Sequence, residues 1–393
     1  MTAVSAWVLE EGVLHLNHGS FGATPAAVLE AQQRLRSRME ANPTKYFLGG
    51  DYQRELDSAR RAVADFVGGD EAGLVFVNNV TAGVNAVLRS LEPALGPGDE
   101  ILVTDHEYNA CRNAVEVSAS RTGAKVTTVQ VPFPIESSRQ AADTVLAAVT
   151  DHTRILLIDA VTSATGLVMP VAEIAAEVEP DVRVLVDAAH APGMIDFDVA
   201  ASGASYVTAN CHKWMCSAKG AGFLWVRADR RDDVYHSVIS HGYNGGWPSG
   251  GGRLHAQFDW TGTDDPSAWL TVPDALDAVG AMHPDGWPGV RRTIRDLCLS
   301  GRRILLDALG IDPPAPDDMI GAIASVPVPP AGHSGTEIFD PLMAALEQRH
   351  RIQVPVFIWP APPERLLRIS AHLYNDESQY RRLADAVTAE LNA

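Results

Sequence analysis

Residues 183–190 read RVLVDAAH, a short apolar run that ends in a carboxylate. The run is brief and rich in valine, which is typical of a strand buried on both faces of a parallel sheet. Asp187 ends it and His190 follows. A carboxylate at the end of a buried strand is costly unless a cation or a hydrogen-bond donor meets it. The stretch therefore predicts a strand that delivers Asp187 to a polar site.

Six further apolar runs of similar length surround this stretch. Helix-length segments such as DTVLAAVT (143–150) and PVAEIAAEVEP (170–180) separate several of them. This alternation predicts an α/β fold whose mostly parallel, mixed seven-stranded sheet is covered on both faces. The six runs are LVFV (74–77), EILVTD (100–105), KVTTVQV (125–131), RILLIDAV (154–161), YVTAN (206–210) and GFLWV (222–226).

The remainder of the chain predicts a smaller α+β unit. Strand-like IASVPV (323–328), IQVPV (352–356) and LLRISA (366–371) precede an amphipathic helix, ESQYRRLADAVTAEL (377–391). HGYNGGWPSGGGR (241–253) indicates a glycine-rich loop or lid, and VPVPPAG (326–332) a surface connection. We predict an N-terminal segment (1–20) that contributes to the active site, a large α/β domain (21–265) and a small C-terminal domain (266–393).

Composition excludes several classes of partner. The 393 residues contain 31 basic and 49 acidic side chains, a formal charge of -18, which opposes binding to nucleic acid or anionic membrane. The N-terminus lacks the basic start and apolar run of a signal peptide, so we expect a cytoplasmic protein. Its four cysteines form no CxxC pair, so neither a disulfide framework nor a metal site is predicted.

Polar side chains follow five of the predicted strands. Ligands of open α/β sheets bind beyond the carboxyl ends of the strands, so these side chains are candidates for a site. Each has an ordinary explanation by itself, such as a helix cap for Thr81 or a surface loop for Tyr108. The residues are Thr81, then His106 and Tyr108, then Ser163 and Thr165, then Asp187 and His190, then His212 and Lys213.

Lys213 lies in TANCHKWM (208–215), directly after a predicted buried strand. Its stem could pack on Trp214 with the ammonium in water; burial would instead lower its pKa and make it a nucleophile. Together the five strand ends supply a phosphate cradle, a ring-stacking side chain, a carboxylate and a lysine. Pyridoxal phosphate (PLP) needs these groups. We therefore predict that Lys213 forms the Schiff base with the PLP aldehyde.

Motifs along the whole chain resemble class V aminotransferase-family enzymes of PLP fold type I. Within that family they are similar to the isopenicillin N epimerase-like branch, which also contains cysteine carbon–sulfur lyases. The motifs are LNHGSFG (16–22), EANPTKYF (40–47), NNVTAGVN (78–85), DHEYNA (105–110), TSATG (162–166), VDAAHAPG (186–193), NCHKW (210–214), WTGTDD (260–265) and RISAHLYND (368–376).

The resemblance implies a role for each matching residue. Lys213 would be the Schiff-base lysine, Asp187 the partner of the ring nitrogen, His190 the partner of the ring hydroxyl and His106 the stacking and catalytic side chain. Further implied cofactor contacts come from Thr81, the Ala82 N–H, Ser163, Asn210 and His212. Thr263 would reach the phosphate of a neighbouring subunit, which implies a homodimer with shared active sites. Implied substrate contacts come from His18, Ser20, Tyr243 at the entrance and Arg368 on the carboxylate.

The sequence identifies the cofactor more closely than it identifies the reaction. After residue 216 the sequence contains only Cys298, inside the helical pattern TIRDLCLSGRRILL, which disfavours a persulfide-forming desulfurase. We expect β-elimination from a cysteine S-conjugate, with Lys213 removing the α-proton and Tyr108 assisting the departing sulfur. The alternatives are epimerisation, with Tyr108 or His18 as second acid/base, and decarboxylative or oxidative deamination in natural-product biosynthesis. A noncatalytic PLP-binding protein is a fourth.

Overall fold

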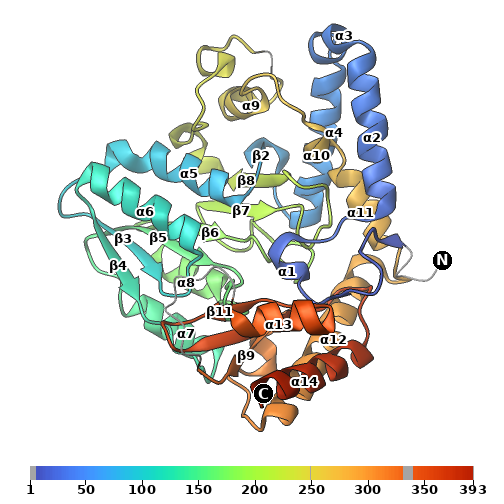
Figure 1. The fold of residues 1–393 in the computed structure, drawn as a ribbon. Coiled ribbons are helices and arrows are strands. Elements are labelled where there is room, and N and C mark those ends of the chain that lie inside the picture. Colours follow the sequence, from blue (N-terminus) through green and yellow to red (C-terminus); the bar gives the residue numbers. More distant parts are fainter. Residues whose placement is uncertain (1–5, 248, 331–339, 393) are drawn as a thin grey trace.

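A seven-stranded mixed sheet forms the centre of the computed structural model, which describes residues 6–247, 249–330 and 340–392 (Figure 1). All seven predicted runs form its strands. Neighbouring strands are parallel except around β8, which is antiparallel to both neighbours. The order is β2 (Leu74–Val77), β8 (Gly222–Val226), β7 (Tyr206–Asn210), β6 (Arg183–Asp187), β5 (Thr153–Asp159), β3 (Glu100–Thr104) and β4 (Lys125–Val129).

Alternate strand residues enter two separate apolar layers, because successive side chains of a strand point to opposite faces. Ile155 and Leu157 of β5 pack with α5 (Val80–Leu91) and α6 (Asn109–Thr122). Leu156 and Ile158 pack into the larger core on the other face. Helices contributing to that core include α4 (Asp51–Val67), α7 (Ser138–Leu146), α8 (Val171–Val178), α11 (Val272–Gly280) and α12 (Gly286–Leu309).

The C-terminal part contains a three-stranded antiparallel sheet in the order β11 (Val356–Ile358), β12 (Arg365–Ser370) and β9 (Ile323–Val328). Helices α12, α13 (Pro341–His350) and α14 (Glu377–Leu391) lie alongside it (Figure 1). The predicted strand IQVPV was wrong as one element. Its first residues form β10 (Ile352–Gln353), parallel to β1 (Leu14–His15), and β11 starts after Pro355, which has no N–H for a ladder.

Shorter elements complete the fold. The glycine-rich segment carries a 3-10 turn and the start of α9 (Gly252–Asp259), so the prediction of a simple loop was only partly right. Of VPVPPAG, residues 326–328 belong to β9 and residues 331–332 lie outside the described part. The other helices are α1 (His18–Phe21), α2 (Ala26–Ala41), α3 (Pro43–Leu48) and α10 (Ser267–Leu270), with 3-10 segments at Glu71–Gly73, Glu92–Ala94, Ala228–Asp233, His241–Asn244 and Asp317–Met319.

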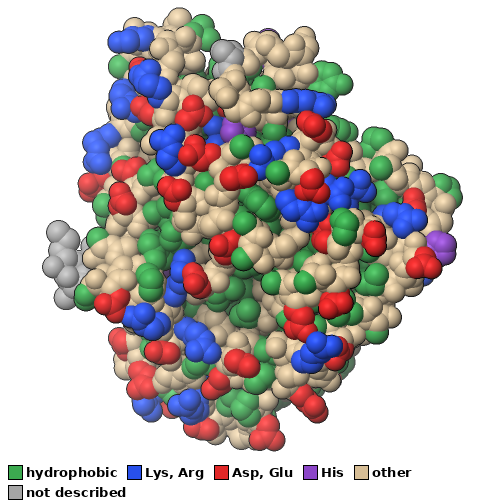
Figure 2. Space-filling model, turned by 180° about the vertical axis from the view of Figure 1, so that it is seen from behind, with side chains coloured by type: hydrophobic (Ala, Val, Ile, Leu, Met, Phe, Trp, Pro, Cys, Tyr) green, Lys and Arg blue, Asp and Glu red, His purple; other side chains and the backbone are tan. Residues whose placement is uncertain are grey.

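Charged side chains of both signs lie on the surface. Figure 2 shows acidic and basic side chains interspersed over one face. Among the described helices, none combines the length and apolar character required to cross a bilayer.

Candidate active site

Lys213 follows β7 and lies next to a histidine that follows β6. Its Nζ is 3.1 Å from His190 Nε2. Burial, and after it the positive charge of Arg368, lowers the pKa of Lys213 to about 8. Burial also lowers the pKa of His190 well below its usual value, and the Lys213 charge adds to this. A neutral His190 therefore meets a lysine that is partly unprotonated near neutral pH, as a nucleophile requires.

Asp187 ends β6 with its carboxylate buried at 2% exposure. Oδ1 accepts a hydrogen bond from the Ala189 N–H at 2.9 Å, and Oδ2 accepts from the Cys111 thiol at 3.3 Å. Burial raises the pKa of Asp187, whereas the Ala189 N–H and the Lys213 charge oppose that rise. Two donors and a nearby cation make this carboxylate the best supported anion of the site.

A pocket of about 280 Å³ lies between these residues. It brings together side chains from the N-terminal segment, the start of α5 and the ends of the central strands, as expected for an open α/β sheet. Predicted residues that line it are Ser20, Thr81, Tyr108, Ser163, Asp187, His190, Asn210, His212 and Lys213. Phe21, Asn79, Val80, Asp159 and Ala189 also line it and were not predicted.

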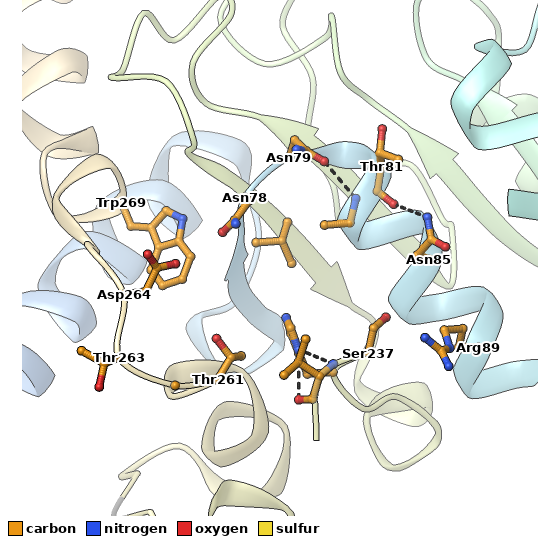
Figure 3. A pocket seen from close by; sticks show the side chains of 15 residues that line it. Asn78, Asn79, Thr81, Asn85, Arg89, Ser237, Thr261, Thr263, Asp264 and Trp269 are labelled. Atoms are coloured by element: carbon orange, nitrogen blue, oxygen red, sulfur yellow. Dashed lines mark hydrogen bonds between the residues drawn. The ribbon is translucent and has the colours of Figure 1, made fainter. Parts of the chain in front are cut away.

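The start of α5 lies between this pocket and a second one of about 670 Å³ (Figure 3). Asn210 Oδ1 accepts from the Val80 N–H at 3.0 Å, and Asn79 Oδ1 accepts from the Ala82 N–H at 3.0 Å. The predicted free Ala82 N–H is therefore occupied by the helix cap. Thr81 lines both pockets, so it is the residue at this helix start that remains well placed for an anion.

His212 is neutral in this arrangement. Its Nδ1 lies 2.8 Å from the Ala221 carbonyl oxygen, which can only accept, so Nδ1 carries the proton. Burial lowers the pKa of His212 to about 4. Because a phosphate dianion offers no proton, His212 must gain one at Nε2 to donate to it, and the phosphate charge favours that uptake.

Arg368 of β12 is a buried cation. Its Nη1 donates to Ser163, at 2.7 Å from the carbonyl oxygen and 3.3 Å from Oγ, and its Nη2 donates to Ser20 Oγ at 2.9 Å. Among the described residues no carboxylate forms an ion pair with it, and its Nε has no hydrogen-bond partner. Burial lowers its pKa to about 10. Arg368 itself is 1% exposed and does not line the pocket, but its partners Ser20 and Ser163 do, so a ligand carboxylate would reach the guanidinium by displacing one of these hydroxyl groups.

The stacking and catalytic roles predicted for His106 do not agree with its placement. Its Nδ1 bonds Thr165 Oγ1 at 2.7 Å and its Nε2 bonds the Val131 carbonyl oxygen at 2.9 Å. The ring packs against Trp359 at 4.7 Å between centroids, outside the pocket lining. Tyr108, two residues later, lines the pocket and is half exposed. Tyr108 is therefore the aromatic side chain that this loop supplies.

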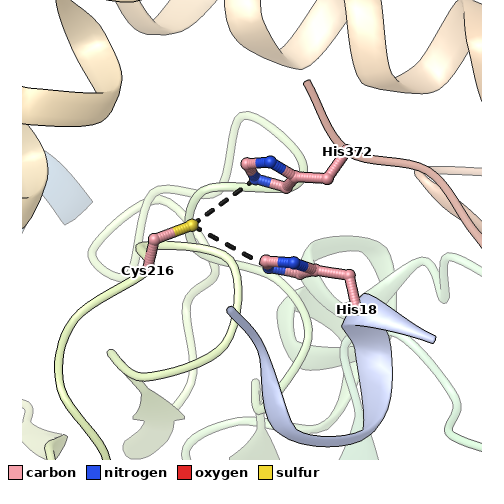
Figure 4. Close-up of side chains that lie close together, drawn as sticks. All are labelled: His18, Cys216 and His372. Carbon is pink, nitrogen blue, oxygen red and sulfur yellow. Dashed lines mark hydrogen bonds between the residues drawn. The ribbon is translucent and has the colours of Figure 1, made fainter. Parts of the chain in front are cut away.

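His18 also lies outside the pocket, contrary to its predicted substrate contact. It is fully buried, with Nδ1 2.9 Å from the Tyr374 hydroxyl and Nε2 3.1 Å from the Lys213 carbonyl oxygen. Figure 4 shows it beside Cys216 and His372. The two imidazole rings are stacked, 4.1 Å apart and 17° from parallel, so one metal ion cannot lie in both ring planes. His18 instead supports the backbone of Lys213.

Tyr243 and Thr263 lie apart from the Lys213 pocket of their own chain. Tyr243 is exposed in the 3-10 segment His241–Asn244 and is not among the residues lining that pocket. Thr263 lines the second pocket, on a loop across from Thr81, Asn85 and Arg89 of α5 (Figure 3). The predicted entrance role of Tyr243 is therefore not supported within one chain.

The residues of the pocket fit PLP. A buried carboxylate with two donors suits a pyridinium nitrogen, and a helix start with a threonine suits a phosphate. Lys213, whose pKa is about 8, suits the aldehyde.

Comparison with known proteins agrees with this geometry. Residues 20–242 match the family model for Aminotransferase class-V. The chain belongs to the class-V aminotransferase family. An isopenicillin N epimerase of Amycolatopsis lactamdurans is 35% identical, over 96% of this chain and 95% of that protein. A putative L-cysteine desulfhydrase of Oryza sativa subsp. japonica is 31% identical, over 96% of this chain and 83% of that protein.

Solved structures place the class-V chain in fold type I. A C-DES mutant with glycine linked covalently to its PLP cofactor superposes with a TM-score of 0.80 at 22% identity, covering 96% of this chain and 97% of that one. The predicted family, fold class and PLP cofactor are thereby confirmed, and the protein is a PLP-dependent enzyme.

Sequence reasoning missed two acidic residues of this class-V site. Asp159 lies within RILLIDAV and is the last residue of β5, as Asp187 is of β6, and it lines the pocket. Glu107 lies between His106 and Tyr108 and is 7% exposed. Asp159 could have been found as a second acid at the end of a buried strand. Glu107 could have been found as an acid in a loop that already contained two candidate residues.

Proposed function

We propose that the protein cleaves the carbon–sulfur bond of a cysteine S-conjugate by β-elimination. With water consumed, the products are a thiol, pyruvate and ammonia. Relatives named L-cysteine desulfhydrase and the chemistry of the pocket both support this proposal. The observation that carries it is the presence of Lys213 and Tyr108 in one pocket, whose lining residue Ser20 bonds the buried cation Arg368.

Each residue of the pocket has a separate role in this reaction. PLP, when bound, withdraws electrons from the substrate Cα and so acidifies the α-proton. Lys213 accepts this proton, since its lowered pKa leaves a neutral amine available. Tyr108 donates its hydroxyl proton to the sulfur as the Cβ–S bond breaks. Asp187 would meet the ring nitrogen of PLP and His190 its ring hydroxyl.

Arg368 orients the substrate. Its guanidinium binds the substrate carboxylate in a bidentate pair, replacing part of its bonding to Ser20 and Ser163. An arginine on the carboxylate also stabilises the ionised form that decarboxylation must consume. This disfavours the decarboxylative route, whereas β-elimination leaves the carboxylate intact.

Epimerisation is the second candidate, because the 35% identical relative is named isopenicillin N epimerase. That reaction requires a second acid/base besides Lys213. His18 does not line the pocket, and both its ring nitrogens have protein partners, so Tyr108 is left as the candidate for this role.

We also propose that the protein forms a homodimer. Thr263 and its neighbours Thr261 and Asp264 border the open second pocket at the α5 start. In the proposed dimer Thr263 of one subunit reaches the cofactor phosphate of its partner.

Pyruvate release from a series of S-substituted cysteines tests the proposal, with solvent deuterium uptake at Cα measured in the same samples. We expect pyruvate and a stoichiometric thiol from the protein and neither from Lys213→Ala. Deuterium at Cα without pyruvate would establish epimerisation. If no cysteine thioether yields pyruvate or thiol, β-elimination is wrong. Loss of the cofactor's visible band in Lys213→Ala, combined with no turnover of any amino acid, would indicate a noncatalytic PLP-binding protein.

A further inference from the structure

Two carboxylates end neighbouring strands at the same level of the sheet. Asp159 of β5 and Asp187 of β6 are register partners, and the Ala160 N–H donates to the Asp187 carbonyl oxygen at 2.7 Å. Both side chains line the Lys213 pocket and both residues are 2% exposed. In the strand alternation they follow Leu157 and Leu185, so they lie on the α5–α6 face.

Glu107 adds a third carboxylate from the loop between β3 and α6. Its Oε1 accepts from the Tyr108 N–H at 3.1 Å, and its carboxyl group interacts electrostatically with those of Asp159 and Asp187. One oxygen of Glu107, the sulfur of Cys111 and one oxygen of Asp187 all lie within 4.8 Å of one another. Three buried acids therefore share one small volume at the pocket floor.

Hydrogen-bond donors are distributed unequally among these acids. Asp187 receives the Ala189 N–H and the Cys111 thiol. Asp159 Oδ2 and Glu107 Oε2 are buried, and within the described residues neither meets a donor. Ionised carboxylates only accept, so a hydrogen bond between Glu107 and Asp159 requires a proton on one of them. A proton on either acid would supply a donor that these buried oxygens lack.

We propose that Glu107 and Asp159 share one proton at neutral pH and act as a positioning pair beside Asp187. The pair then carries one negative charge rather than two, and Asp187 remains the ionised partner for the cofactor ring nitrogen. Carboxyl pairs that share a proton arise when two such groups are held in contact. This inference concerns the cofactor site, so it holds for either reaction considered above.

Charges around the pair support the shared proton. Burial first, and then neighbouring carboxylates, raise the pKa of Glu107 and of Asp159 well above their usual values. The other titratable and charged groups that face them are Asp187, Cys111, Arg112 and Lys213.

The pair predicts how stability changes with pH. A carboxyl whose folded pKa lies above its unfolded value binds a proton more tightly in the folded protein. The stability it contributes is therefore complete below the unfolded pKa, about 4, and is lost as pH rises toward the folded pKa. Relative to a variant without the proton, the folding equilibrium constant of the wild type should fall about tenfold per pH unit between these limits.

The experiment measures urea unfolding of the full-length protein from pH 6 upward, in the wild type and in the double variant Glu107→Gln/Asp159→Asn. The amides replace the shared proton with permanent N–H donors. We expect the ratio of wild-type to variant folding constants to fall by about tenfold per pH unit. Parallel curves for the two proteins would overturn the proposal.

Glu100→Gln is the matched control. Glu100 is also buried, but hydrogen bonds from Thr127 and Thr153 and the charge of Lys125 outweigh its desolvation and lower its pKa. Its replacement should change the folding constant at acid pH and leave the pH dependence of that constant above pH 6 unchanged.

Infrared spectroscopy provides a readout on the folded protein that does not rely on the unfolding equilibrium. A protonated carboxyl has a carbonyl band that carboxylates lack. This band should be present in the wild type and in Glu100→Gln at neutral pH, and absent from the double variant. If the double variant does not fold, the single variant Glu107→Gln replaces it, because its amide donor leaves Asp159 free to ionise. Absence of the band from the wild type would also overturn the proposal.

Discussion

At the residue scale, short motifs identify the side chains of the site but not the directions in which those side chains point. Lys213, Asp187 and His190 could be assigned from the sequence because each follows a buried strand whose direction is known. His106 and Tyr108 lie on one loop, only two residues apart. Which of them enters the pocket depends on Trp359 and Phe133, whose rings contact His106. The assignment to His106 was therefore the weaker one.

The pKa of Lys213 leads to a prediction about PLP capture. The neutral amine is the nucleophile, so the rate at which cofactor-free protein binds PLP should rise with pH and level off above about 8. Arg368→Met removes a repelling charge and should move this midpoint to higher pH. Arg368→Lys keeps the charge and should leave it near 8. Stopped-flow absorbance measures each profile, and a common midpoint for both variants would show that Arg368 exerts no electrostatic effect on Lys213.

At the element scale, the close approach of α5 to β7 decides where the start of α5, the predicted phosphate site, lies. A Cβ on Gly83 would be 2.1 Å from Thr208 Oγ1 and 2.8 Å from Thr208 Cβ. Only glycine permits α5 to approach the strand this closely, which holds Thr81 at the pocket. The pattern NNVTAGVN predicts a helix start but not this distance, since the partner strand is more than 100 residues away.

Gly83→Ala should destabilise the protein by about 1–3 kcal/mol, although alanine favours helices, because overpacking outweighs the propensity gain. Cofactor affinity should fall as well, since the α5 start would shift. Gly96→Ala is the control, because the methyl group that alanine adds there would have no atom within 4 Å, and its effect should stay within about 0.5 kcal/mol. Urea unfolding and PLP titration measure both quantities. Equal stability of the two variants would mean that α5 has room to move.

At the scale of the whole molecule, a buried ion pair joins two distant segments. Arg60 of α4 pairs with Asp259 at the end of α9, with side-chain exposures of 3% and 1%. The Tyr52 hydroxyl donates to the Asp259 carbonyl oxygen in the same place. The loop from 260 to 264, which borders the second pocket, follows directly. This pair therefore holds the end of α9, and with it the start of the loop that borders the second pocket.

Arg60→Met should destabilise the protein by about 3–5 kcal/mol, because Asp259 is left buried without its main counter-ion. The double variant Arg60→Met/Asp259→Leu should recover much of this loss. Arg36→Met removes a comparable but exposed pair with Asp265 and should cost less than about 1 kcal/mol. Thermal or urea unfolding compares all three. A double variant no more stable than Arg60→Met would contradict this account.

The sequence by itself determined the strand runs, the α/β class and the PLP cofactor, and it placed Lys213 and Asp187 at strand ends, because each of these follows from local patterns of apolar and polar residues. Tertiary structure alone decided that His106 and His18 face away from the pocket, that Ala82 is capped, and that Glu107 meets Asp159. The contact between those two acids spans 52 residues and depends on strand register. Register is set by packing across the whole sheet, so no local pattern contains it.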